Sequence, residues 1–190
     1  MKTQIDSMID ESITAKEYLR MQAEELLRAA EMIYQCFSRG YKMLIFGNGG
    51  SAADAQHIAA EFMGRFKNER RGLAAIALST DTSFLTAWPN DGYNFDTIFA
   101  RQVESLSIPK DLLWGISTSG NSSNVVNAFK KGREIGTYNI SFTGREGGRL
   151  KELSDANINI PLNNTARIQE AHELAYHIIC ELVDNYVVNR

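Results

Sequence analysis

Short, unbroken runs of hydrophobic residues alternate along the chain with longer segments of helical periodicity. The short runs are typical of strands buried on both faces. They lie at 43–46, 73–78, 112–116, 139–142 and, more weakly, 158–160. Between them, apolar residues recur at intervals of three and four, which predicts helices. These helices cover 52–66, 84–90, 94–106, 125–135 and 166–188. Alternating strands and helices predict an α/β fold in which helices cover both faces of a parallel sheet.

The N-terminal segment has a different pattern. Apolar residues at helical spacing predict one long helix from Glu11 to Arg39, ended by Gly40. A helix of this length before the first strand suggests partner helices and therefore an oligomer. No repeat, low-complexity tract or change of composition divides the 190 residues. We therefore expect a single domain, with residues 1–40 as a helical extension and 41–190 as the α/β core.

Charge and composition exclude several classes of partner. With 20 basic and 23 acidic residues, the chain has no broad cationic surface for nucleic acid. Its first residues are polar and acidic, unlike a signal peptide, and no window approaches the roughly 18 uncharged apolar residues of a membrane span. Cys36 and Cys180 lie in apolar-periodic segments and have no nearby partner cysteine. We expect a soluble cytoplasmic protein with two buried free thiols.

Two predicted strands run directly into loops suited to an anion. The first strand is followed by Gly-Asn-Gly-Gly-Ser at 47–51 and the third by Ser-Thr-Ser-Gly-Asn-Ser-Ser at 117–123, and a helix follows each loop. Glycines allow close backbone approach, the first amides of a helix point at an anion, and hydroxyls add donors. The alternative is that these serines and asparagines only cap helices. Two such loops at strand ends of one sheet favour a phosphate site.

Two other nucleotide-binding patterns fit poorly. Gly47, Gly49 and Ala52 match G-x-G-x-x-A, but a dinucleotide site also needs an acidic residue at the end of the second strand. The residues that directly follow this strand are Ser79 and Thr80, neither of which is acidic. The chain also contains no G-x-x-x-x-G-K-[ST] motif. Neither a nicotinamide nor a nucleoside triphosphate site is favoured.

Candidate acid, base and metal groups lie on two helices. His57 and Glu61 are four residues apart, and Gln169, Glu173 and His177 form a stripe at the same spacing. Such pairs can chelate a metal or act as acid and base on one substrate, although each alone is common on helix surfaces. His172 is on a different stripe of its helix. The residues by themselves thus indicate a phosphate site with acid/base groups, a combination that suits sugar-phosphate chemistry.

Four segments together resemble a known family. They read GNGGSAADAQHIAAE at 47–61, ALSTDTS at 77–83, GISTSGNS at 115–122 and TARIQE at 165–170. In order and spacing they are similar to the bacterial sedoheptulose 7-phosphate isomerases, members of the sugar isomerase (SIS) domain superfamily. The likeness covers the chain from about Tyr41 to its end. It implies a flavodoxin-like, five-stranded parallel sheet and a homotetramer with active sites between subunits.

The resemblance also implies roles for individual residues. Glu61 would be the catalytic base and His177 the acid in an aldose–ketose isomerisation through an enediol, serving lipopolysaccharide, capsule or other surface glycans. One zinc ion per subunit would be held by His57, Glu61, Gln169 and His177. Substrate contacts would come from Asn48, Gly49, Gly50, Ser51, Asn90, Asp91, Ser117, Thr118, Ser119, Ser122 and Gln169.

One segment departs from the family pattern, and two other functions stay open. Residues 88–95 read WPNDGYNF where the family has Asn-Asp-Tyr-Gly-Tyr-Glu, so the pocket wall there can differ. A non-catalytic adapter of the DnaA initiator-associating type shares the fold, but that branch lacks the acid and histidine found here as Glu61 and His177. A sugar-phosphate sensor would carry an added DNA-binding domain, for which the first 40 residues leave too little room.

Overall fold

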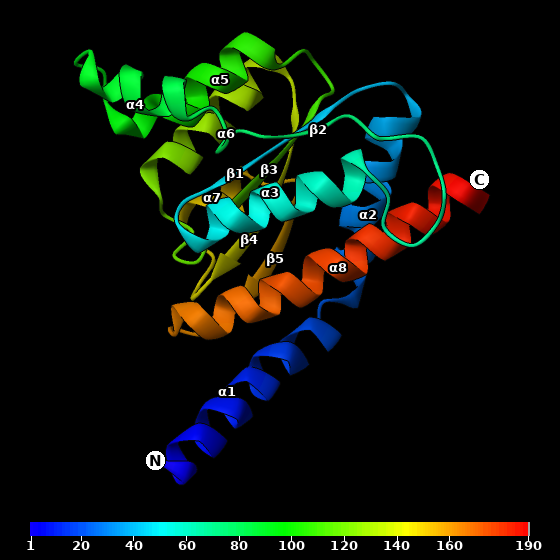
Figure 1. The fold of residues 1–190 in the computed structure, drawn as a ribbon, viewed down its shortest axis with the longest axis vertical. Coiled ribbons are helices and arrows are strands. Elements are labelled where there is room, and N and C mark those ends of the chain that lie inside the picture. Colours follow the sequence, from blue (N-terminus) through cyan, green and yellow to red (C-terminus); the bar gives the residue numbers. More distant parts are fainter. Residues whose placement is uncertain (190) are drawn as a thin grey trace.

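A five-stranded parallel sheet lies between two layers of helices (Figure 1). The computed structural model describes residues 1–189. The strands are β1 (Met43–Gly47), β2 (Ala75–Ala77), β3 (Leu112–Ser117), β4 (Tyr138–Gly144) and β5 (Ala156–Ile160). Their order is β2-β1-β3-β4-β5, with every neighbouring pair parallel. This is the flavodoxin-like order, so the predicted fold class is confirmed.

The helices divide between the two faces of the sheet. One face is covered by α1 (Lys2–Arg20), α2 (Ala23–Ser38), α3 (Gly50–Met63) and α8 (Thr165–Asn189). The other is covered by α4 (Thr82–Asn90), the 3₁₀ turn η1 (Phe95–Thr97), α5 (Ile98–Leu106), α6 (Ser123–Ile135) and α7 (Gly148–Leu153). Within residues 1–189, no helix has the length and apolar character needed to span a membrane.

The central strands are buried on both faces, as their unbroken apolar runs predicted. Every residue of β1 and β3 is buried. On one face Trp114 packs edge-on against Phe142, with ring centroids 4.9 Å apart, and on the other Phe46 stacks on Phe99 at 5.2 Å. Burying an aromatic side chain of this size stabilises the fold by about 1.5–3 kcal/mol. The sheet is therefore a rigid platform for the loops at its strand ends.

The prediction of one long N-terminal helix from Glu11 to Arg39 was wrong. The chain forms two helices, α1 and α2, that meet at Met21 and Gln22. The Gln22 side chain donates to the Asn159 carbonyl at 2.6 Å and accepts from the Asn159 amide at 2.8 Å. Asn159 is in β5, an edge strand of the sheet, so Gln22 satisfies backbone groups that a sixth strand would otherwise pair. This contact between distant segments bends the chain away from a continuous helix.

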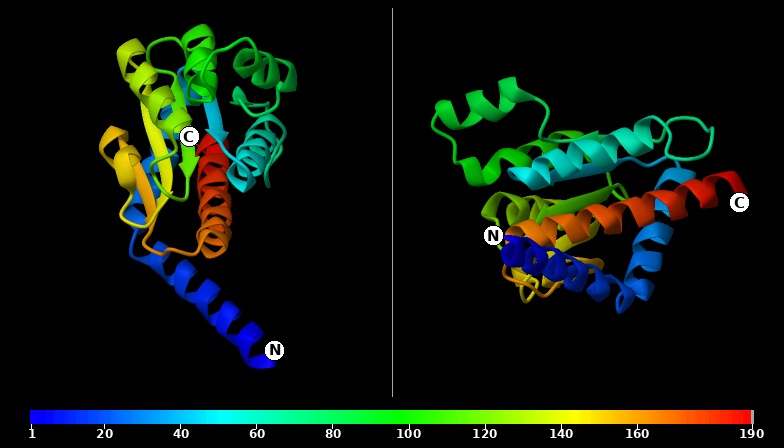
Figure 2. Two further views of the ribbon diagram at one scale, coloured as in Figure 1. Left: turned by 90° about the vertical axis from the view of Figure 1, so that its left-hand side faces the viewer. Right: turned by 60° about the horizontal axis from the view of Figure 1, so that its bottom comes forward.

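The first part of α1 extends away from the rest of the molecule, as the left view of Figure 2 shows. Its second part packs on α8, where Ala15 and Leu19 are buried. The projecting part carries four half-exposed apolar side chains at helical spacing. They are Ile5, Met8, Ile9 and Ile13, with exposed fractions of 52% to 58%.

Other differences between prediction and structure concern the ends of elements. The apolar run 73–78 is longer than β2, because only Ala75–Ala77 pair with β1. Conversely, β5 begins two residues earlier than predicted. Helix α7 was missed, since six residues are too few to show a helical period. Helix α4 begins at Thr82, where the Asp81 side chain accepts a hydrogen bond from the Phe84 amide at 3.0 Å.

The strand order fixes where a ligand site can form. The connection from β1 through α3 leads outward to β2, whereas that from β3 through α6 leads the other way to β4. Loops that diverge in this way leave a crevice at the carboxyl ends of β1 and β3. The two predicted anion loops are the loops at these two strand ends.

Candidate active site

The loop after β1 depends on glycine at the end of the strand. A side chain at Gly47 would place its Cβ 2.8 Å from the Ser51 Cβ and 2.9 Å from the Ile116 carbonyl oxygen. Gly49 has a φ of 57° and precedes the first residue of α3, a conformation that favours glycine. Helix α3 therefore begins directly beside β3, with its first turn at the crevice, where it can bind an anion.

An amide pair joins this loop to the second one. Asn48 donates to the Asn124 side-chain oxygen at 2.9 Å, and Asn124 donates back at 2.8 Å. Asn124 is buried in the first turn of α6, and sequence reasoning did not identify it. In this reciprocal pair the side-chain amide of Asn48 is hydrogen-bonded to the protein itself, and the pair fixes the distance between the two loops.

The second loop presents a cluster of hydroxyl groups. The Ser117 hydroxyl lies 2.8 Å from that of Ser122 and 3.3 Å from that of Ser119. The loop turns at Gly120, whose φ is 65° and where a Cβ would lie 2.0 Å from the Gly147 carbonyl oxygen. No residue but glycine fits there without backbone movement. The serines are thus held together by a turn that is itself packed on the chain before α7.

Helix α8 closes the crevice with Gln169. The Gln169 amide nitrogen would be 2.5 Å from a Cβ at Gly50, so the side chain lies directly against the start of α3. The resulting pocket has a volume of about 320 Å³. It is lined by Asn48, Gly49, Gly50, Ser51, Ile116, Ser117, Thr118, Ser122, Thr165 and Gln169. Most of the substrate residues predicted from the sequence therefore line one pocket; Asn90, Asp91 and Ser119 are not among its lining residues.

The predicted acid, base and metal groups meet where α3 packs against α8. His57 and Glu61 extend from α3 and His177 from α8, and one ligand atom of each lies within 4.8 Å of the others. Figure 1 shows the two helices side by side across one face of the sheet. Two imidazole nitrogens and a carboxylate oxygen form a donor set that suits Zn²⁺. The residues present therefore fit the metal that the resemblance implies.

Both ring nitrogens of His57 have partners. Nε2 lies 3.1 Å from Glu61 Oε1, and Nδ1 lies 2.9 Å from the Tyr176 hydroxyl. Burial, followed by the charges of Asp54 and Glu173, raises the pKa of Tyr176 above its ordinary value, so Tyr176 is a neutral hydroxyl. Tyr176 was not identified from the sequence, where it is one more apolar position of the last helix.

His177 is held between aromatic rings. Phe66, from the segment after α3, stacks on it with ring centroids 5.9 Å apart, and Tyr176 contacts it edge-on at 4.7 Å. The rings of His57 and His177 are 5.0 Å apart. These contacts fix the imidazole of His177 beside Glu61 before any ligand binds.

A buried ion pair fastens α3 to α8 near this cluster. Arg70 Nε lies 2.6 Å from Asp184 Oδ1, and both side chains are at most 4% exposed. Arg70 also donates to the carbonyl oxygens of Phe62 and Glu61, at 3.0 and 2.9 Å. Burial alone would raise the pKa of Asp184, but hydrogen bonds from Asn68 and Arg70 hold it below its ordinary value. The pair therefore anchors the end of α3 that carries Glu61.

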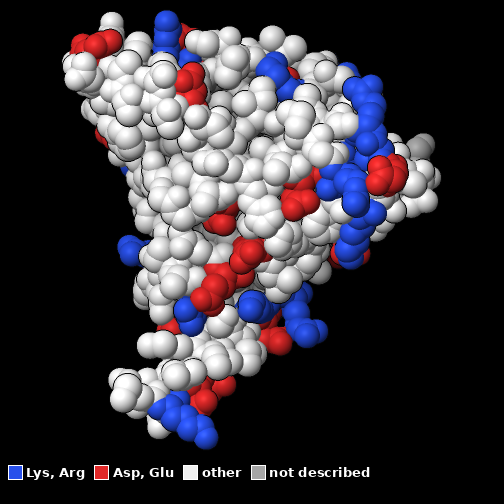
Figure 3. Space-filling model, viewed as in Figure 1, with Lys and Arg blue, Asp and Glu red and all other residues white. Residues whose placement is uncertain are grey.

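Three carboxylates, those of Asp54, Glu170 and Glu173, line a hollow beside Gly50 and Gln169. Burial, followed by the charge of Glu173, raises the pKa of Asp54 to about 6, although His57 opposes the shift. One carboxylate oxygen of Asp54 is buried without a hydrogen-bond partner. Figure 3 shows acidic side chains along this part of the surface, with basic side chains gathered toward the C-terminal end of α8. The negative charge between α3 and α8 favours a bound cation.

His172 and the two cysteines lie apart from this chemistry. His172 is completely buried, its Nε2 donates to the Thr143 carbonyl at 2.9 Å, and burial lowers its pKa to about 4. It is therefore a neutral core residue on a different stripe from His177, as predicted. Cys36 and Cys180 are free and buried, which confirms the expectation from the sequence.

Asn90 and Asp91 are exposed at the end of α4. In the same unusual segment, Trp88 stacks on Tyr93 with ring centroids 3.8 Å apart, and its indole nitrogen donates to Thr97 at 2.9 Å. The segment that departs from the family pattern is thus stabilised by its own aromatic stack.

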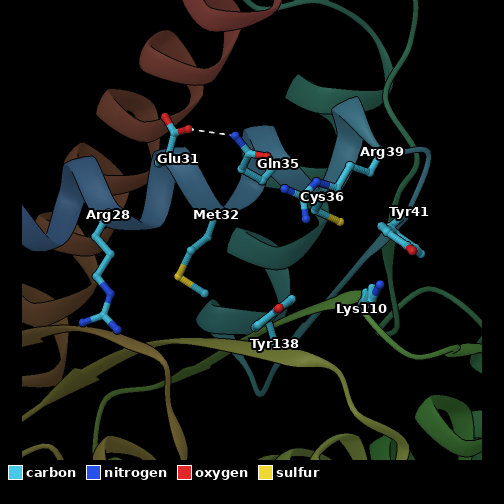
Figure 4. Close-up of a pocket in the computed structure, with 9 residues that line it drawn as sticks. All are labelled: Arg28, Glu31, Met32, Gln35, Cys36, Arg39, Tyr41, Lys110 and Tyr138. Carbon is cyan, nitrogen blue, oxygen red and sulfur yellow. Dashed lines mark hydrogen bonds between the residues drawn. The ribbon is translucent and has the colours of Figure 1, made fainter.

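Another cavity, of about 340 Å³, lies at the opposite end of the strands (Figure 4). It is bordered by α2 and by the residues that precede β1 and β3. Its lining residues are Arg28, Glu31, Met32, Gln35, Cys36, Arg39, Tyr41, Lys110 and Tyr138. None of the predicted site residues is among them, and parallel sheets bind ligands at the carboxyl ends of their strands. We therefore assign the active site to the crevice at β1 and β3.

Comparison with known proteins identifies the family. The SIS domain model matches residues 10–144. A phosphoheptose isomerase of Aliarcobacter butzleri is 53% identical over 90% of both chains, and one of Aquifex aeolicus is 48% identical over the full length of both. The structure of phosphoheptose isomerase from Neisseria gonorrhoeae matches with a TM-score of 0.91 at 45% identity, over 97% of this chain and 98% of the other. The chain belongs to the phosphoheptose isomerases of the SIS domain family.

Proposed function

We propose that this chain converts sedoheptulose 7-phosphate to D-glycero-D-manno-heptose 7-phosphate through an enediol, as the first step toward heptose units of lipopolysaccharide, capsule or another surface glycan. The observation that carries the proposal is the meeting of His57, Glu61 and His177 within 4.8 Å, on the two helices, α3 and α8, whose N-terminal parts line a pocket of amides and hydroxyls. The pocket suits the phosphate, and the cluster suits the proton transfers.

The proposed chemistry assigns the two proton transfers to Glu61 and His177. Glu61 removes a proton from C1 of the ketose while His177 donates a proton to the carbonyl oxygen at C2, which gives the enediol. The carboxyl group of Glu61 then returns its proton to C2 as His177 takes the proton of the C1 hydroxyl, and the aldehyde forms. Each group acts once as acid and once as base, so the enzyme returns to its starting state.

A zinc ion is the proposed cofactor, one per subunit. His57, Glu61 and His177 would hold it, and when bound it would polarise the substrate carbonyl. Gln169 is the fourth proposed ligand. It is eight residues from His177 on α8, a rise of about 12 Å, and it lies against Gly50. Gln169 and His177 could bind the same ion only if their side chains extended toward each other along α8 or if the two residues came from neighbouring subunits.

A homotetramer in the cytoplasm completes the proposal. The half-exposed stripe of Ile5, Met8, Ile9 and Ile13 on α1 is the kind of surface that subunits cover, and two buried free thiols suit a reducing compartment. Asn90 and Asp91, which do not line the pocket within one chain, would reach a substrate in a neighbouring subunit. Light scattering of the purified chain tests the assembly, and a monomer at micromolar concentration would contradict it.

The function is tested by turnover of sedoheptulose 7-phosphate with and without added zinc. We expect formation of the aldoheptose phosphate by the parent protein and its collapse in Glu61→Gln and His177→Gln. Glu181→Gln is the matched control, because Glu181 is a carboxylate one turn beyond His177 on α8 but is half exposed and paired with Lys67. Absence of turnover under both metal conditions, from protein that still binds the sugar phosphate, would favour the non-catalytic adapter.

A further inference from the structure

The hydroxyl of Tyr176 contacts His57, although Tyr176 takes no part in the proposed reaction and is not a proposed metal ligand. Its side chain is only 1% exposed, yet its hydroxyl lies 2.9 Å from Nδ1 of His57. The residue precedes His177 on α8 and points toward α3, so it reaches His57 on the ring edge that faces away from Glu61. The hydroxyl is therefore a direct partner of a group in the catalytic cluster.

The tyrosine ring cannot move freely. It packs edge-on against the ring of His57 with centroids 5.4 Å apart and edge-on against His177 at 4.7 Å. Burial of the ring among packed side chains restricts it to one rotamer. The hydroxyl is thus a fixed point for Nδ1, whereas the imidazole of His57 is itself 42% exposed.

A hydroxyl suits both protonation patterns that His57 needs. Without a metal, Nε2 donates its proton to the Glu61 carboxylate, which only accepts, and Nδ1 then accepts from Tyr176. With a cation in the cluster, Nε2 must offer its lone pair, so the proton is on Nδ1 and the Tyr176 oxygen accepts it. A carbonyl or carboxylate in place of the hydroxyl would serve only the second pattern.

We propose that Tyr176 is a positioning residue whose hydroxyl holds Nδ1 of His57 and directs Nε2 into the space shared with Glu61 and His177. The metal-binding half of this inference rests on the proposed zinc site, whereas the contact with Nδ1 does not. In metal sites, partners of this kind orient the ligating imidazole, and their loss typically weakens metal affinity by about 10- to 100-fold.

The test compares the full-length parent with Tyr176→Phe, which keeps the ring and removes the hydroxyl. The first measurement is zinc affinity of the metal-free proteins by competition with a chromogenic chelator. The second is the ¹⁵N spectrum of His57 in the absence of metal, which reports hydrogen bonding at each ring nitrogen. Tyr138→Phe, which removes a half-exposed hydroxyl at the opposite end of the sheet, is the matched control.

We expect Tyr176→Phe to raise the zinc dissociation constant about 10- to 100-fold and to move the His57 Nδ1 resonance toward that of a nitrogen without a hydrogen bond, with thermal unfolding little changed. Tyr138→Phe should alter neither. Affinity within threefold of the parent together with an unchanged Nδ1 resonance would overturn the proposal. If the parent binds no zinc, the zinc site fails, and the Nδ1 resonance alone decides whether Tyr176 positions His57.

Discussion

The anion loops and the His57–Glu61–His177 cluster both involve helix α3 but are held by different forces. The loops are shaped by backbone geometry, with Gly47 and Gly120 in places where a Cβ would collide with neighbouring atoms. The cluster depends on the packing of two helices whose contributing residues are more than 100 positions apart. Substrate affinity and chemistry should therefore be separable by mutation.

The largest expected effect is on the cluster. Glu61→Gln removes the proposed base while keeping the size of the side chain, and general-base catalysis contributes about 10²–10⁴ in rate. We expect kcat to fall by about 10³, with an unchanged melting temperature, in steady-state assays of sedoheptulose 7-phosphate isomerisation. Retention of more than a tenth of the parental kcat would show that another group is the base.

The next largest effect is expected from the Arg70–Asp184 ion pair, and it tests whether the packing of α3 on α8 holds the cluster in place. Arg70→Ala leaves Asp184 buried without its counter-charge, which should lower the free energy of unfolding by about 3–5 kcal/mol in urea titrations and reduce kcat as well. Lys67→Ala is the matched control, because Lys67 pairs with Glu181 at an exposed position and should cost less than about 1 kcal/mol. Equal effects of the two substitutions would contradict the anchoring role of Arg70.

A smaller effect is expected from the loops. Ser122→Ala removes a hydroxyl that lines the pocket and lies 2.8 Å from that of Ser117. Loss of one hydrogen bond to a charged phosphate should raise KM about 10-fold, with kcat changed by less than threefold. Ser105→Ala, on the exposed surface of α5, is the control. A loss confined to kcat would mean that this loop takes part in the chemistry and not only in binding.

The smallest effect concerns Asp54 and the pH. Its pKa of about 6 in the folded protein exceeds the ordinary value near 4, so the folded state binds the proton more tightly than the unfolded state. Protonated Asp54 therefore favours the folded state; this contribution to the free energy of unfolding is fully present below about pH 4 and is lost as the pH rises through 6. Asp54→Asn should therefore stabilise the metal-free protein at pH 8 by about 1 kcal/mol, since the partly solvated group is screened, and should have little effect at pH 4. Equal effects at both pH values would contradict a raised pKa.

Much of the fold follows from local patterns. All five strands lie where short apolar runs predicted them, because strands buried on both faces are mostly apolar, as β1 and β3 are. The break at Gln22 could not be predicted, since its cause is a hydrogen-bonded contact with Asn159 in β5. The two anion loops could be predicted because the glycine and hydroxyl residues of each loop are contiguous in the sequence and directly follow a strand.

The cluster could be predicted only in part. Spacing shows that His57 and Glu61 share a helix face, but which faces of α3 and α8 meet depends on the whole core. The supporting residues were missed for the same reason. Tyr176 has the pattern of a core aromatic, and Arg70 that of a surface charge, until Asp184 is brought to it from 114 residues away.

The most direct test of separate binding and chemistry is the affinity of Glu61→Gln for sedoheptulose 7-phosphate, measured by calorimetry on the same sample that is assayed for turnover. The two-part site predicts a dissociation constant within about threefold of the parental KM, because the phosphate loops are intact, together with a loss of turnover of about 10³. Loss of affinity in proportion to the loss of turnover would contradict the account, since it would mean that the cluster and the loops form one inseparable site.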